Sequence, residues 1–97
     1  MFSIKWETAA IEEQISIFEF WNNLNKSKEY SRKLFKEIKR LEGLLSKNPS
    51  IGTLTDFSNI RKIVVFSNFS IFYKVVDKTI YIVKIWDNHR NPDNLIF

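Results

Sequence analysis

The chain has 97 residues, of which 44% are hydrophobic, 15% aromatic and 27% charged, as in one small globular domain. We therefore expect residues 1–97 to form a single domain. The absence of Cys and the single His exclude disulfides, thiolate metal sites and sites built from several His, so we expect no metal and no cofactor. The sequence has no signal-like N-terminus and no apolar run that could cross a bilayer, so we expect a cytoplasmic protein with no membrane contact.

The net charge of +4 is distributed unevenly along the chain. Residues 1–25 carry one Lys against four Glu, whereas residues 26–47 carry eight Lys or Arg against three Glu. Residues 60–90 add six cations against two Asp. This excess indicates an acidic or polyanionic partner, although a lysine-rich helix face that keeps a small protein soluble has the same pattern.

The first half of the chain reads as a short strand followed by two helices. Residues 2–6 alternate apolar and polar side chains, which predicts a strand. A helix is predicted over residues 8–24, with Thr8 as its N-cap. A short polar segment follows and separates this helix from a second one. Ser27 is a candidate N-cap of the second helix, and Asn48-Pro49 is predicted to end it. The apolar stripes of the two helices are Ile11, Ile15, Phe18 and Leu24 in the first, widened by Ile17, Phe20 and Trp21, and Leu34, Ile38, Leu41 and Leu45 in the second.

The second half of the chain changes from a helical period to a period of two. After a loop over residues 49–59, three β-rich segments are joined by two-residue connections, which predicts antiparallel strands. They are Ile60–Phe66, Phe69–Val76 and Thr79–Trp86. A short tail with a turn at Asn91-Pro92 ends the chain. We therefore expect an α+β fold in which a short N-terminal strand precedes a two-helix hairpin packed on one face of an antiparallel β-sheet, with the other face free.

Motifs in a fixed order along nearly the whole chain resemble the RelE/ParE superfamily of toxins from bacterial type II toxin–antitoxin systems. These motifs are Ile4-Lys5-Trp6 with Ala10, Tyr30-Ser31-x-Lys33-Leu34, Asn48-Pro49-x-Ile51-Gly52, Ile60-Arg61, Phe69-Ser70-Ile71-Phe72-Tyr73, and Ile85-Trp86-Asp87-Asn88-His89-Arg90-Asn91-Pro92. The resemblance implies the same α+β architecture and a growth inhibitor that a cognate antitoxin neutralises in a hetero-oligomer. It also implies a target, which is DNA gyrase in ParE-like members and messenger RNA on the ribosome in RelE-like members.

Metal-free RNA cleavage needs a base, a proton donor and cations around the phosphate, and few residues could supply them. His89, Arg90 and Tyr73 are the catalytic candidates, and Arg61, Lys62 and Asp87 are candidates for contacts with a substrate or target. Each has a structural alternative. His89 is equally compatible with a solvated surface residue, Tyr73 with a core aromatic, and Arg61 with a strand anchor paired to Asp56 or Asp87. Trp21 and Trp86 are expected to be packing residues.

One departure from the RelE-like pattern separates the two branches. RelE-like nucleases carry an arginine in the strand motif where this chain has Ser70. The Asn91-Pro92 pair that ends the last motif, in contrast, is more similar to ParE-like members. ParE-like gyrase inhibition is therefore slightly favoured over ribosome-dependent endoribonuclease activity, and whether the protein is an enzyme stays open. A small basic module that binds nucleic acid, and a toxin that has lost its activity, are further alternatives.

Overall fold

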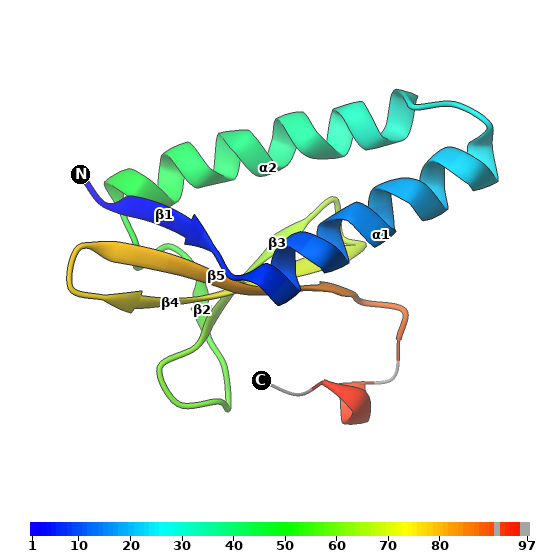
Figure 1. Ribbon diagram of the computed structural model, residues 1–97. Helices are drawn as coiled ribbons and strands as arrows, with labels where there is room; N and C mark the ends of the chain where they lie inside the picture. The colour runs from blue at the N-terminus through cyan, green and yellow to red at the C-terminus, as the bar shows by residue number, and fades with distance from the viewer. Residues whose placement is uncertain (91, 96–97) are drawn as a thin grey trace.

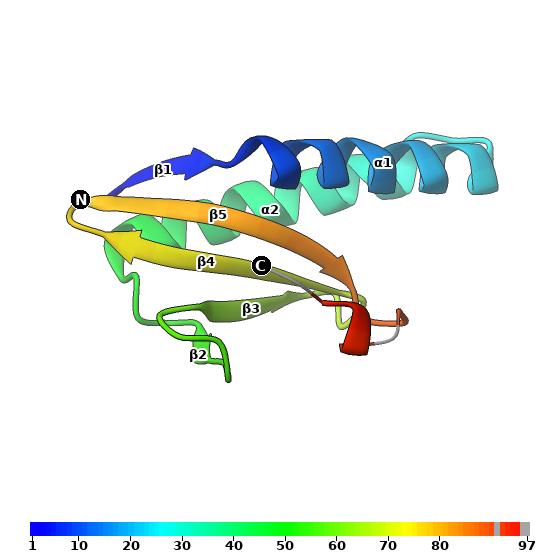
Figure 2. The same ribbon diagram turned by 60° about the horizontal axis from the view of Figure 1, so that its bottom comes forward.

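The computed structural model describes residues 1–90 and 92–95, which form two helices packed on one face of a five-stranded sheet (Figure 1). The strands lie in the order β1-β5-β4-β3-β2. Strands β2 to β5 are antiparallel neighbours, while β1 runs parallel to β5 (Figure 2). The element bounds are β1 (Ser3–Trp6), α1 (Thr8–Asn25), α2 (Glu29–Lys47), β2 (Thr53–Leu54), β3 (Arg61–Val65), β4 (Phe69–Val76), β5 (Thr79–Asp87) and η1 (Pro92–Asn94).

The sheet contains two features that the sequence pattern does not show. A two-residue strand, β2, lies within the segment predicted as a loop and pairs with the start of β3. The predicted N-terminal strand joins the sheet beside β5, with Ser3 opposite Thr79, and this makes the sheet mixed. Periodicity identifies a strand but not its neighbour, since pairing partners distant in sequence are chosen by tertiary packing.

Helix α2 lies as its apolar stripe predicts. The stripe residues Leu34, Ile38, Leu41 and Leu45 are all buried and face the sheet, where they pack against β-strand residues of the main core. The predicted Ser27 cap is wrong, because α2 begins at Glu29 with Lys28 as its N-cap, and no side chain among the described residues caps the helix. The Ser27 hydroxyl accepts the Glu29 backbone N–H at 3.1 Å in the turn before the helix.

Helix α1 uses a different face from the one its pattern predicts. Ile11, Ile15 and Leu24 are 42%, 48% and 60% exposed, while Ala10 is fully buried and Ile17 packs against the main core. The predicted stripe is therefore wrong at Ile11, Ile15 and Leu24, whereas Ile17, Phe18 and Trp21 of the same prediction do pack against the main core. Apolar residues lie on most sides of α1, so periodicity alone does not select the face that meets the sheet. The predicted Thr8 cap is also wrong. Thr8 is the first helical residue, and the extended Glu7 before it makes no side-chain cap.

The sheet face away from the helices carries a second, smaller core. Ile60, Phe72 and Trp86 are buried there, and Val83 and Leu95 pack against them. The face expected to be free is therefore partly covered by the C-terminal segment. Asn91, one half of the predicted turn, lies outside the described residues, and Pro92–Asn94 form a short 3-10 helix. Within residues 1–90 and 92–95, neither helix is long and apolar enough to span a membrane.

Candidate functional site

The six candidate residues fall into two groups at different places on the sheet. Tyr73 lies opposite Arg61 of β3 and Ile82 of β5, whereas Asp87 lies opposite Phe69. The four-residue step along β4 from Phe69 to Tyr73 corresponds to about 13 Å. His89 and Arg90 follow Asp87 in sequence, so they belong to the second group. The residues therefore do not form one cluster.

The Tyr73 hydroxyl is fully engaged inside the protein. Tyr73 is completely buried, its hydroxyl donates to the Pro49 carbonyl oxygen at 2.7 Å, and it accepts from the Gly52 backbone N–H at 2.8 Å. Burial raises the pKa of this phenol above its usual value. The side chain thus fastens the loop after α2 to the middle of the sheet, as expected for a core aromatic with a satisfied hydroxyl.

Arg61 binds the same loop through two backbone carbonyls. Its Nη1 atom donates to the Gly52 carbonyl oxygen at 2.7 Å and to the Ser50 carbonyl oxygen at 3.2 Å. The predicted anchoring role is present, but the partners are backbone carbonyls and not Asp56 or Asp87. Lys62, the next residue along β3, is exposed.

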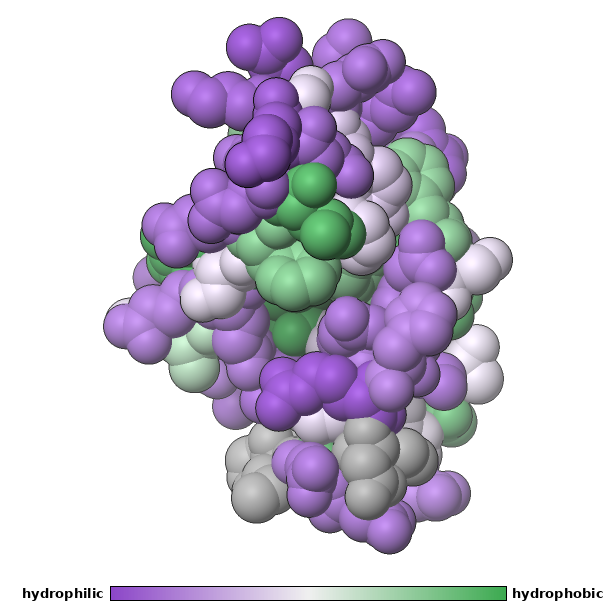
Figure 3. Space-filling model, turned by 90° about the vertical axis from the view of Figure 1, so that its right-hand side faces the viewer, coloured by the Kyte–Doolittle hydropathy of each residue, from purple (hydrophilic) through white to green (hydrophobic). Residues whose placement is uncertain are grey.

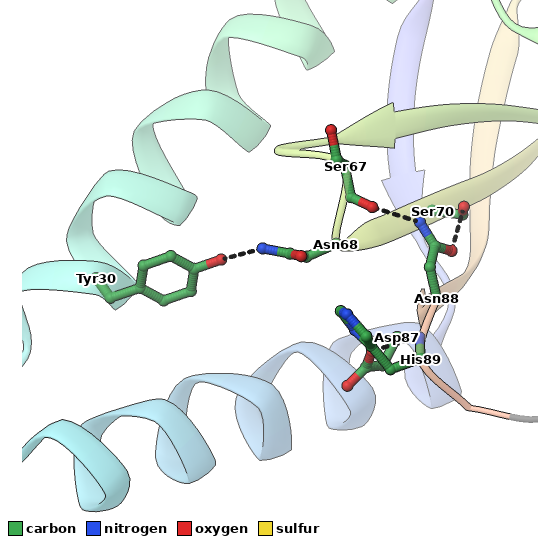
Figure 4. A network of polar contacts seen from close by, with 7 residues as sticks. All are labelled: Tyr30, Ser67, Asn68, Ser70, Asp87, Asn88 and His89. Atoms are coloured by element: carbon green, nitrogen blue, oxygen red, sulfur yellow. Dashed lines mark hydrogen bonds and ion pairs between the residues drawn. The ribbon is translucent and has the colours of Figure 1, made fainter.

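The second group is organised by the Asp87 carboxylate at the end of β5 (Figure 4). One carboxylate oxygen accepts the His89 backbone N–H at 2.9 Å and lies 3.0 Å from His89 Nδ1. The imidazole itself is largely exposed. The Arg90 backbone N–H donates to the Asp87 carbonyl oxygen, and the Arg90 guanidinium lies 4.5 Å from the centre of the Trp86 ring.

Ser70 and Asn88 tie the segment after β5 to the turn before β4 (Figure 4). The buried Ser70 hydroxyl donates to Asn88 Oδ1 at 2.7 Å, and Asn88 Nδ2 donates to the Ser67 carbonyl oxygen at 3.3 Å. Asn68 extends the network to α2, because its Nδ2 atom donates to the Tyr30 hydroxyl at 3.3 Å. The position where a RelE-like nuclease carries arginine is therefore filled by a buried structural serine. Sequence reasoning missed Asn88, whose role depends on contacts between separate elements.

A groove of about 510 Å³ lies between α1 and the end of β5. Hydrophobic side chains gather in the middle of this end of the molecule and are bordered by hydrophilic ones (Figure 3). Two of the six candidates, Asp87 and Arg90, line the groove. We call it the α1–β5 groove; its apolar lining is Ile17, Phe20, Trp21, Phe69 and Ile85, and its charged lining is Glu12, Glu13, Asp87 and Arg90.

The wall of the α1–β5 groove includes the end of β5, which has no neighbouring strand from the described residues on the side away from β4. Strand β1 ends at Trp6, opposite Ile82, so it does not accompany β5 to its end. Beyond that point Glu13 of α1 takes its place: its carboxylate accepts the Ile85 N–H at 3.2 Å and pairs with the Lys84 ammonium at 2.8 Å. The Ile85 N–H therefore points away from β4, and by the alternation of an antiparallel ladder so does the Asp87 backbone.

The α1–β5 groove offers a partner an apolar floor, three carboxylates and one arginine. Among residues 1–90 and 92–95, no three His, Asp or Glu side chains come together in a way that could hold a metal ion.

Comparison with known families decides the class of this protein. The family model for the ParE toxin of the type II toxin–antitoxin system parDE matches residues 4–92. The chain belongs to the ParE toxin family. It is thus a type II toxin of the RelE/ParE superfamily, and within that superfamily the ParE-like assignment is favoured over the RelE-like one.

Solved structures support the same fold for this ParE-family chain. A chain from the chromosomal ParDE TA system of P. aeruginosa is 23% identical, with a TM-score of 0.75, and the match covers 90% of this chain and 96% of that one. YafQ from E. coli strain BL21(DE3) is 12% identical, with a TM-score of 0.58, and the match covers 92% and 96%. Among curated proteins, none matches this chain significantly.

Proposed function

We propose that this ParE-family toxin inhibits DNA gyrase by binding to it, without a hydrolytic step, and that a cognate antitoxin neutralises it. Family membership supports a toxin of this kind. The observation that carries the non-catalytic mechanism is the position of Tyr73, whose buried hydroxyl already has a donor and an acceptor about 13 Å along the sheet from Asp87. His89 and Arg90 are left without the third group of the candidate catalytic set.

The contact surface in this proposal is the α1–β5 groove. Aromatic and arginine side chains are the residues that most often dominate binding energy at interfaces. The groove provides Phe20 and Trp21 beside the Arg90 guanidinium, which Trp86 holds in place. Lys62 is exposed and stays a candidate for additional contacts with the target.

The test is a DNA supercoiling reaction with purified gyrase and purified toxin, run beside a cell-free translation reaction with a defined messenger RNA. We expect blocked supercoiling and an intact message. Arg90→Ala should raise the toxin concentration needed for half-inhibition by about tenfold, as for loss of an interface arginine. The control is Arg40→Ala, because Arg40 is exposed on α2 and paired with Glu37, away from the groove. Normal supercoiling at saturating toxin would contradict the proposal.

The second candidate is ribosome-dependent cleavage of messenger RNA. The observation that favours it is the 3.0 Å contact between His89 Nδ1 and Asp87 beside Arg90, since a carboxylate can orient an imidazole for proton transfer. Cuts in the message that require ribosomes and disappear in His89→Ala would establish this activity in place of gyrase binding.

A further inference from the structure

A second hollow, of about 370 Å³, opens between the two helices. Phe18 of α1 and Phe35 of α2 form its apolar part, with ring centroids 6.3 Å apart in an edge-to-face arrangement. The Ser31 hydroxyl fixes the helices beside it, because it lies 2.6 Å from Asn22 Oδ1 and 3.2 Å from the Phe18 carbonyl oxygen. We call this the hairpin slot, formed by the two phenyl rings and a basic rim of Lys28, Arg32 and Lys36.

The basic rim carries charge that the protein leaves unneutralised. Lys28, Arg32 and Lys36 are exposed at every fourth position, so they form a row of about 12 Å along one side of α2. None has a carboxylate within ion-pair distance in the part of the chain that the structure describes. The other cations within α2, except the terminal Lys47, do have such partners, since Lys33 pairs with Glu29, Lys39 with Glu42 and Arg40 with Glu37.

Apolar side chains continue from the hairpin slot along α1. Ile11 and Ile15 precede Phe18 at the spacing that places residues on one side of a helix, and they are 42% and 48% exposed. They form the stripe that the sequence pattern predicts to be buried. Ile11 and Ile15 have the composition of a core-facing surface, but the described structure leaves each of them about half exposed.

The hairpin slot differs in place and charge from the α1–β5 groove. By the helical repeat, Phe18 and Asn22 lie on the opposite side of α1 from Glu13 and Phe20. The lining of the groove includes three carboxylates and one arginine, whereas the charged residues around the slot are all basic. A segment that complements one surface in charge therefore does not complement the other.

We propose that the antitoxin lays an acidic amphipathic helix on the hairpin slot, with bulky apolar side chains against Phe18 and Phe35 and carboxylates along Lys28, Arg32 and Lys36. This inference rests on the proposed function, which requires an antitoxin. Helix-in-groove docking needs an apolar strip flanked by complementary charge, and the slot with its α1 stripe supplies both. The slot is less suited to stacking of nucleic-acid bases, because the Phe18 and Phe35 rings pack edge to face and the Lys39 ammonium lies 5.2 Å from the Phe35 ring centre.

The experiment measures the affinity of full-length toxin for its purified cognate antitoxin. In the first variant, Lys28→Glu, Arg32→Glu and Lys36→Glu are combined, and we expect Kd to rise about 30-fold, with much less salt dependence than the wild type. The matched control combines Lys5→Glu, Lys47→Glu and Lys78→Glu, which make the same charge change on other exposed residues. Phe35→Ala, compared with Leu44→Ala, tests the apolar part, because both side chains lie on α2 and are 43% exposed.

The outcomes separate this inference from the proposed function. If the antitoxin binds the wild type but the slot variants match their controls, the slot is not its docking surface and the inference is overturned. The inference also fails if the slot variants keep antitoxin affinity but lose gyrase inhibition or binding to a single-stranded oligonucleotide. If the antitoxin does not bind the wild type, the proposed function itself fails. Thermal unfolding of each variant verifies that the fold is intact.

Discussion

The two groups of candidate residues occupy contrasting surroundings. Around Tyr73 the phenol is buried and the polar groups are matched, since the Tyr73 hydroxyl and the half-buried Arg61 guanidinium bind three backbone carbonyls and one N–H of the loop after α2, and only Lys62 of this group is exposed. Around Asp87 the side chains are more exposed and several donors of His89 and Arg90 face solvent. Residues that resemble catalytic candidates in sequence thus divide into a set that stabilises the fold and a set that is accessible to a partner.

The largest effect should come from Gly52→Ala in the Tyr73 group. A Cβ at Gly52 would lie 2.7 Å from Tyr73 Cε1 and 2.9 Å from the Lys62 carbonyl oxygen, and closer still to the Tyr73 hydroxyl. We expect this overpacking to lower the free energy of unfolding by about 3 kcal/mol, measured by urea denaturation.

Gly43→Ala is the matched control for that change. Nothing lies within 4 Å of a Cβ at Gly43, which is exposed in α2, so we expect a gain of about 0.5–1 kcal/mol from helix propensity. Equal stability of the two variants would mean that the loop at Gly52 yields easily and is not held by Tyr73.

Tyr73→Phe should have the next largest effect. It leaves the Gly52 N–H and the Pro49 carbonyl oxygen without their side-chain partner, which should cost about 2 kcal/mol in the free energy of unfolding. Toxicity per folded molecule should stay unchanged. A loss of toxicity without a loss of stability would instead place the phenol in a reaction.

The pH dependence of stability provides a finer probe of Tyr73. Burial raises the pKa of its phenol, so the unfolded chain loses this proton at lower pH than the folded protein does. The contribution of the protonated phenol to the free energy of unfolding is complete below the pKa of about 10 that tyrosine has in the unfolded chain. It disappears as the pH rises through the raised pKa of the folded protein. Denaturation midpoints of the wild type should therefore fall more steeply above pH about 10 than those of Tyr73→Phe.

The smallest effect on stability should come from His89→Ala. The imidazole is largely exposed and its main contact is with Asp87, so we expect a change of at most about 0.5 kcal/mol. Gyrase inhibition should persist. Loss of toxicity in this folded variant would move the interpretation towards the nuclease alternative and would weaken the contrast between the two groups.

Local pattern predicts most elements of this fold but few of their tertiary partners. The stripe from Leu34 to Leu45 has a single apolar side, so its buried face follows directly from periodicity. Helix α1 has apolar residues on several sides, and the choice of Ala10 over Ile11 depends on how closely α1 approaches β5. The parallel pairing of β1 is likewise a long-range choice.

The candidate site was less predictable than the fold for the same reason. A residue type indicates which chemistry a side chain could perform, but its partners decide whether it is available. Arg61 is engaged by carbonyl groups, which carry no sequence signal, and Asn88 becomes important only because Ser70 and Ser67 lie beside it. The basic composition of residues 26–47, in contrast, correctly indicated a basic surface on α2.

The pairing of β1 with β5 links folding to synthesis of the whole chain. Ser3 can pair with Thr79 only after the ribosome has synthesised Thr79. Strands β4 and β5 also provide much of the surface on which both helices pack. Such distant contacts cannot form on an incomplete chain. A ribosome-bound fragment that lacks β5 should therefore remain unfolded and harmless, so the toxin can begin to act only after translation has passed the last strand of its sheet.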